Sequence, residues 1–187
     1  SGRIDLEGVQ LKLFHEGANQ FDLVTSDRAQ FQPEERSLYS DGDVEIILAV
    51  PVDGPTPGRL LNIHSSGVQF SSETGEATTD RPVSFEFDAG GGSAVGAHYN
   101  PASRELRMEN KVVLDWRGRN PDAQPMHIEA GQAWYLETQS KVVFPKWAKL
   151  TRTGLQMDSG AAEVLLDEGE IHQANMDAAR GAQRSAG

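Results

Sequence analysis

The side chains of this 187-residue chain that could do chemistry are mainly histidines and carboxylates. Imidazole and carboxylate groups bind metal ions when short motifs bring several of them together. None of the histidines stands in a recognised metal-binding pattern with another ligand type. The sequence therefore predicts no metal site and places the histidines at the surface or at strand edges; they are His15, His64, His98, His127 and His172.

Catalysis has equally little support. With 28 acidic residues, a histidine near a carboxylate is expected by chance, and the chain contains no cysteine and no nucleophile-elbow motif. The stretch "GGGSAVG" from Gly90 resembles a phosphate loop only in its glycines, because the Lys-Ser/Thr pair is missing and a strand follows. We expect it to be a flexible crossing between sheets. No catalytic residue, no cofactor and no enzyme activity is predicted; a carbohydrate-processing jellyroll would need two facing carboxylates that no motif marks.

The charge excludes two classes of partner. The net charge is −11, so the chain lacks both the basic footprint of a nucleic-acid binder and a polybasic membrane patch. No run of 18 apolar residues occurs. The absence of cysteine rules out disulfides but leaves the redox compartment open.

The elements that carry these side chains repeat along the chain. An aromatic or apolar anchor recurs at intervals of 39, 29, 36 and 29 residues, with a small residue two places before it and an apolar follower seven places after it. Thirteen and fifteen residues after the first four anchors, two more apolar positions recur. The anchors are Phe31, Phe70, Tyr99, Tyr135 and Val164; the followers are Leu38, Ala77, Leu106, Val142 and Ile171; the small residues are Ala29, Val68, Ala97, Ala133 and Ala162.

The local period within each unit predicts strands. Val83, Phe85 and Phe87 alternate with polar residues, which is the period of a half-buried strand. Between anchors and followers lie turn formers such as "QPEERS" and "NPASRE". Helical composition occurs only in the last residues. The sequence predicts an all-β fold of stacked strand repeats, a sandwich, barrel or solenoid, whose small residues mark the place where two sheets approach closely.

Domain organisation is simple. The loop "VPVDGPTPGR" explains the long first interval, and no change in composition divides the chain. We expect one domain over residues 6–175 and a flexible tail over 176–187. The opening Ser-Gly is typical of the remnant left by a cleaved tag, so we also expect that an N-terminal signal or anchor has been removed.

Three stretches resemble a known family. They are "SDRAQFQPEERSLYSDGDVEI" from Ser26, "TGEATTDRPVSFEF" from Thr74 and "GGGSAVGAHYNPASRELRMENKVVL" from Gly90. Their order and spacing resemble the OstA-like family of lipopolysaccharide-export proteins, and the single "TDRPV" is most similar to its LptC branch. The resemblance covers about residues 6–175.

The resemblance implies a twisted, open β-jellyroll, the β-taco, and a transport function without chemistry. Relatives hold the lipid A acyl chains of lipopolysaccharide in an apolar groove and join edge to edge, by strand addition, into a bridge across the periplasm. The expected partners are lipopolysaccharide, an LptA-like bridge protein and an inner-membrane transporter, with no nucleic acid. An N-terminal helix would anchor the protein to the inner membrane. An LptA-like bridge subunit is the alternative within the family.

One set of side chains is expected to share the inner face. Before the resemblance, an ordinary dry core is the simpler interpretation of these residues, and a structural assembly module with a dry interior remains an alternative. With the resemblance, they become the predicted lipid-binding groove: Phe31, Val44, Ile46, Phe70, Val83, Phe85, Tyr99, Val112, Leu114 and Tyr135.

Overall fold

A computed structural model describes residues 2–55, 60–167 and 170–178, with side chains through residue 166. Fifteen strands form one continuous sheet, and the only helical element in this part of the chain is the short 3-10 turn η1 (Glu137–Gln139). The strands are β1 (Ile4–Phe14), β2 (Gln20–Gln32), β3 (Ser37–Ser40), β4 (Val44–Pro51), β5 (Asn62–Ser65), β6 (Val68–Ser71), β7 (Ala77–Phe87), β8 (Gly90–Asn100), β9 (Glu105–Trp116), β10 (Met126–Ala130), β11 (Ala133–Leu136), β12 (Lys141–Phe144), β13 (Ala148–Arg152), β14 (Leu155–Asp167) and β15 (Glu170–Ala178).

The sheet is an antiparallel meander that is folded over along its middle. The short strands β3 and β4 follow one another and pair side by side with the long strand β2. In the same way β6 and β5 share β7, β11 and β10 share β9, and β12 and β13 share β14. Each long strand therefore runs through both halves of the fold, whereas each short strand belongs to one half.

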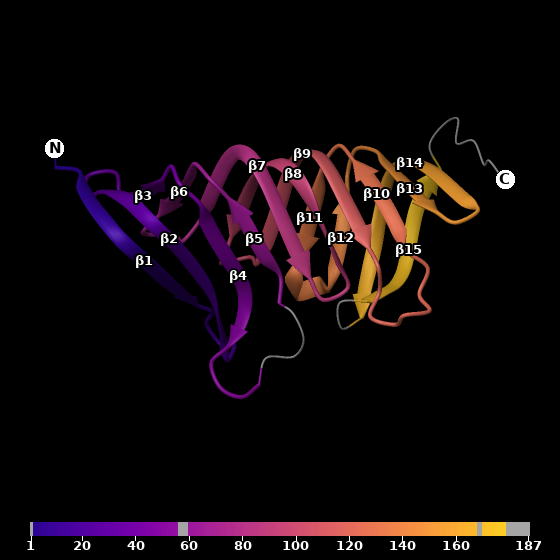
Figure 1. Cartoon of the computed structure of the whole chain (residues 1–187), viewed down its shortest axis with the longest axis horizontal. Coiled ribbons are helices and arrows are strands. Elements are labelled where there is room, and N and C mark those ends of the chain that lie inside the picture. Colours follow the sequence, from indigo (N-terminus) through magenta and orange to yellow (C-terminus); the bar gives the residue numbers. More distant parts are fainter. Residues whose placement is uncertain (1, 56–59, 168–169, 179–187) are drawn as a thin grey trace.

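We call the two halves the first and the second layer. The first layer contains β3, β6, β11 and β12, and the second contains β4, β5, β10 and β13. The line along which the long strands bend from one layer to the other is called the crease, and the opposite side, where the hairpin turns lie, is called the mouth. In Figure 1 the strands are stacked along the long axis, and β1 and β15 lie towards opposite ends of the stack. This is the β-jellyroll that the sequence predicts.

Local irregularities bend the long strands at the crease. The β7–β8 register shifts between Thr79 and Pro82, and the β14–β15 register shifts between Ser159 and Ala162. Gly96 in β8 has a φ of 81° and Lys111 in β9 a φ of 49°. Bulges with a residue in the left-handed region bend a strand and increase its twist, which lets one strand serve two layers.

The sequence repeat corresponds to the hairpins at the mouth of the first layer. Phe31 pairs with Leu38, Phe70 with Ala77, Tyr99 with Leu106 and Tyr135 with Val142, so four anchors and their followers are cross-strand partners. The fifth unit differs, because Ile171 pairs with Leu166 and the register of β14 and β15 shifts beside it. The turns predicted between anchors and followers are thereby confirmed.

The other positions of the repeat form the core. The small residues before the anchors lie beside the crease and are all buried: Ala29, Val68, Ala97, Ala133 and Ala162. The positions thirteen residues after the anchors are buried on the second layer: Val44, Val83, Val112 and Ala148. Burial of this apolar area is the main stabilising contribution, at about 25 cal/mol per Å². The small residues are therefore buried beside the line where the two layers join.

The glycine-rich stretch corrects one expectation. Gly90, Gly91 and Gly92 do not form a flexible crossing but begin β8, paired with β7 and β9. A Cβ at Gly90 would lie 2.1 Å from the carbonyl oxygen of Asp115, and one at Gly92 would lie 2.0 Å from that of Val113. The backbone of β9 is therefore too close to β8 for a side chain at these two positions. Composition alone does not distinguish such a glycine-rich strand from a flexible loop.

The described sheet extends slightly beyond both ends of the predicted domain, residues 6–175. β1 starts at Ile4, and β15 continues to Ala178, into the segment expected as a tail. Residues 179–187 of that segment and residues 56–59 of the expected loop lie outside the described residues. In the described part of the chain, no helix is long and apolar enough to cross a membrane.

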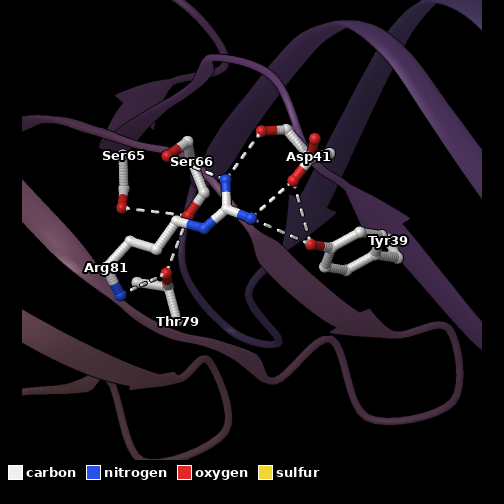
Figure 2. Close-up of polar contacts among 6 residues, drawn as sticks. All are labelled: Tyr39, Asp41, Ser65, Ser66, Thr79 and Arg81. Carbon is white, nitrogen blue, oxygen red and sulfur yellow. Dashed lines mark hydrogen bonds and ion pairs between the residues drawn. The ribbon is translucent and has the colours of Figure 1, made fainter.

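A cluster of polar side chains ties three segments together on the outside of the crease (Figure 2). Arg81 of β7 donates from Nη2 to Asp41 Oδ1 at 2.5 Å and from Nη1 to the Asp41 carbonyl at 3.1 Å. The Tyr39 hydroxyl donates to the same carboxylate at 3.2 Å. Thr79 Oγ1 donates to the Ser66 carbonyl at 2.7 Å, so the turns after β3 and β5 are both fastened to β7.

Replacing Arg81 with glutamine is expected to raise the pKa of Asp41. The hydrogen bond and the charge of Arg81 hold the pKa of this carboxyl below its ordinary value in the folded state. The stabilisation from the pair is therefore present above the unfolded-state pKa and is lost as the pH falls through the lower folded-state value. NMR titration of the Asp41 carboxyl in the parent and the Arg81→Gln protein measures the shift; identical titration curves would contradict the ion pair.

Candidate functional site

A cavity of about 660 Å³ lies between the two layers in the C-terminal part of the fold. Side chains from β4, β7, β9, β11, β12 and β14 form its walls, and the walls are apolar over most of their extent. The volume is within the range of roughly 300–1,000 Å³ that is typical of small-molecule sites. The apolar lining is Leu48, Ala49, Leu60, Leu61, Phe85, Phe87, Met108, Val112, Leu114, Trp116, Ala133, Tyr135, Val142, Phe144, Val164 and Leu166.

The ten side chains of the predicted groove divide into two groups. Phe85, Val112, Leu114 and Tyr135 line the cavity. The other six pack in the same hydrophobic core but do not line the cavity; they are Phe31, Val44, Ile46, Phe70, Val83 and Tyr99. Most of this second group lies in the N-terminal half of the fold.

A buried polar cluster lies next to the cavity, since Ala49 belongs both to this cluster and to the cavity wall. Asp22 of β2 is fully buried, and its Oδ2 accepts a hydrogen bond from the hydroxyl of Tyr99 in β8. Its Oδ1 accepts from the backbone N–H of Ala49 at 2.9 Å, at a bulge in β4 where Ala49 has a φ of 57°. His15 Nε2 lies 2.8 Å from the same carboxylate. Asp22 thus links the two layers across the mouth side of the interior.

The position of His15 corrects the sequence expectation. His15 was expected at the surface or at a strand edge, but only 6% of its side chain is exposed, because the β1–β2 turn folds over the interior towards Asp22. The side chains of His64, His98 and His127 are 36–52% exposed and pair with carboxylates on the outer surface. The side chain of His172 lies outside the described residues.

Glu137 lies beside this cluster and also contributes to the cavity wall. Its Oε1 accepts a hydrogen bond from Gln20 Nε2 at 3.1 Å, which is a second side-chain link between the layers. Burial raises the pKa of Glu137, and the charge of Asp22 raises it further. Burial also raises the pKa of Tyr99, and it raises the pKa of Tyr135 to about 12, so both phenols stay protonated.

The outer rim of the cavity is charged. Arg119 Nε lies 2.6 Å from Asp88 Oδ2, and this ion pair joins the β7–β8 turn to the loop after β9. Both side chains border the cavity and are about one third or more exposed. Among the described residues, no group of three or more histidine, aspartate or glutamate side chains could hold a metal ion. The arrangement suits an apolar ligand with a polar end at the mouth.

Comparison with known proteins shows the family. A family model described as "Lipopolysaccharide-assembly, LptC-related" matches residues 1–115, which is more than half of the chain. The chain belongs to the LptC-related family. This confirms the resemblance found in the sequence. No curated protein matches this LptC-related chain.

One solved structure supports the fold of the LptC-related chain. The crystal structure of LptH from Pseudomonas aeruginosa, described as the LptA homologous periplasmic component of the conserved lipopolysaccharide transport device, aligns with a TM-score of 0.56. The alignment covers 68% of this chain and 94% of LptH, at 10% sequence identity. At that identity the likeness shows a shared fold, and it confirms the β-jellyroll.

Proposed function

We propose that this LptC-related protein is a non-enzymatic carrier of lipopolysaccharide that holds acyl chains in the cavity between its two layers. The observation that carries the proposal is the cavity itself, a large apolar space inside the fold of a lipopolysaccharide-assembly family member. A lipid with several long chains cannot cross water unprotected, and each buried Å² of apolar area contributes about 25 cal/mol to its transfer.

The charge distribution favours binding through the chains rather than the phosphates. The net charge of −11 repels anionic headgroups, so affinity must come from the apolar walls. The headgroup would remain at the mouth, near the ion pair of Asp88 and Arg119. The carrier role requires no chemical step, and the energy for transport would come from a partner.

The proposal also concerns location and partners. From membership of the family, we propose a periplasmic protein that is attached to the inner membrane by an N-terminal helix and that docks with a transporter and an LptA-like bridge protein. In the described part of the chain, β1 pairs only with β2 and β15 only with β14, so each has one free edge. These two edges are available for docking by strand addition. A structural assembly module with a dry interior would use the same edges but would bind no lipid.

Photo-crosslinking tests the carrier role. Benzoylphenylalanine replaces Leu114 or Phe85, whose side chains line the cavity, and in matched controls it replaces the outward neighbours Asp115 or Ser84. In cells, we expect lipopolysaccharide to be captured at the inward positions and only background capture at the outward ones. Equal capture at both, or none at the inward positions, would overturn the proposal and favour the dry assembly module.

A further inference from the structure

A group of titratable side chains lies across the mouth, and the proposed carrier function does not use it. Tyr99, on the first-layer half of β8, donates to Asp22 of the second layer, and Gln20 Nε2 donates to Glu137 Oε1 at 3.1 Å. Gln20 and Asp22 are two residues apart in β2 and lie on the same face of that strand. The two carboxyl groups therefore belong to one cluster, which joins the two layers at the edge of the cavity.

The two carboxyl groups are satisfied to different degrees. Asp22 accepts hydrogen bonds from the Tyr99 hydroxyl and from the backbone N–H of Ala49. Glu137 accepts from Gln20 through Oε1, but its buried Oε2 has no hydrogen-bond partner in the described chain. A buried negative charge is stable only when donors or cations compensate it, so an ionised Glu137 is the weaker of the two links.

The other charges that face Glu137 come from three elements. Asp22 of β2 disfavours a second negative charge, whereas Arg104 in the β8–β9 turn and a protonated His15 in the β1–β2 turn favour it. Burial, followed by the charge of Asp22, raises the pKa of Glu137 despite these two cations. Glu137 therefore keeps its proton to a higher pH when the mouth is closed than when the carboxyl is in water.

We propose that Glu137 is a proton-controlled latch: while it is neutral it holds the two layers together across the mouth, and when it loses its proton the mouth opens and lets an acyl chain in or out. The advantage of the closed state is complete below the ordinary pKa of a glutamate and is lost as the pH rises through the higher pKa of the closed state. The phenols of Tyr99 and Tyr135 stay protonated and take no part. The cargo of the latch rests on the proposed function, but the latch itself is a property of the protein without lipid.

The width of the mouth can therefore be measured in the free protein. The chain has no cysteine, so cysteines introduced at Asn19 and Gln139, which are exposed in the β1–β2 turn and in η1, carry two spin labels. Electron–electron double resonance gives the distance between the labels from about pH 5 to about pH 8, which spans the values to which proteins raise a glutamate. We expect a short distance at the low end and a longer one at the high end. The ratio of open to closed molecules should change at most about tenfold per pH unit, as for a single proton.

Two variants identify the titrating group. Glu137→Gln keeps an acceptor for Gln20 and carries no charge, so this protein should stay closed at every pH. His15→Gln removes a cation that favours the ionised carboxylate, so opening should persist and move to higher pH. A distance in the parent protein that is independent of pH, opening that survives in Glu137→Gln, or a shift to lower pH in His15→Gln would overturn the latch.

Release of a bound fluorescent fatty-acid analogue connects the latch with transport. The parent protein is expected to release the analogue severalfold faster at the high end of the pH range, and Glu137→Gln should release it slowly throughout. A release rate that does not change while the mouth opens would overturn the role of the latch in transfer. If the analogue does not bind at all, the carrier function fails, whereas the distance measurement still decides whether the latch exists.

Discussion

Replacing Asp22 with alanine is expected to lower the free energy of unfolding by about 3–5 kcal/mol. The carboxylate is fully buried and accepts hydrogen bonds from the Tyr99 hydroxyl and the Ala49 N–H, and His15 lies beside it. Its removal leaves these groups buried without their partner, which costs more than the net value of the hydrogen bonds themselves. Urea unfolding followed by tryptophan fluorescence gives the free energy.

Two further variants separate charge from hydrogen bonding. Asp22→Asn keeps one acceptor for the Ala49 N–H and should cost less than Asp22→Ala. Tyr99→Phe removes only the cross-layer hydrogen bond and is expected to cost about 1 kcal/mol. If Asp22→Ala unfolds at the same urea concentration as the parent protein, the carboxylate does not hold the layers together.

Filling the cavity is expected to reduce lipid binding at least tenfold, a change of about 1.4 kcal/mol. Ala133 is a small, buried side chain of β11 in the cavity wall. Tryptophan at this position occupies space that the proposed acyl chain needs, and the cavity can accept the ring with limited strain because the ring enters open space rather than a packed core. Lipopolysaccharide binding by the purified Ala133→Trp protein is the measurement.

The control places the same ring on the outer face of the same layer. Val142 and Phe144 of β12 line the cavity, so Val143 between them points outward. Val143→Trp should bind lipid as the parent protein does. A normal affinity of Ala133→Trp, in a protein whose unfolding shows that it is folded, would mean that lipid does not enter between the layers.

Much of the fold could be predicted because the repeat spacing reflects the hairpins. A follower seven residues after an anchor is its direct cross-strand partner when four or five residues lie between the two strands, as at Phe31 and Leu38 or Tyr99 and Leu106. Alternation with a period of two then assigns one side of each strand to the core. Both signals are local, so a single sequence contains them.

The site could be predicted only in part, because some residues on the inner face of the sheet line the cavity and others pack against side chains of the core. Val83 and Phe85 share a strand face, yet only Phe85 lines the cavity. Whether the layers touch or separate depends on contacts between distant strands. Asp22 gave a usable signal that was missed: it shares the inward phase of Val24 in β2, and a carboxylate in that phase indicates a buried polar contact.

Across the mouth, no backbone ladder in the described sheet pairs a strand of one layer with a strand of the other; the layers are joined at the crease, by the long strands and by the turns between successive short strands. Across the mouth, the bonds found between side chains are those of Tyr99 with Asp22 and of Gln20 with Glu137. Spreading the mouth thus requires few bonds to break, whereas pulling two neighbouring strands apart along the long axis breaks a whole ladder. The arrangement of bonds accordingly makes the molecule more compliant across its mouth than along its long axis.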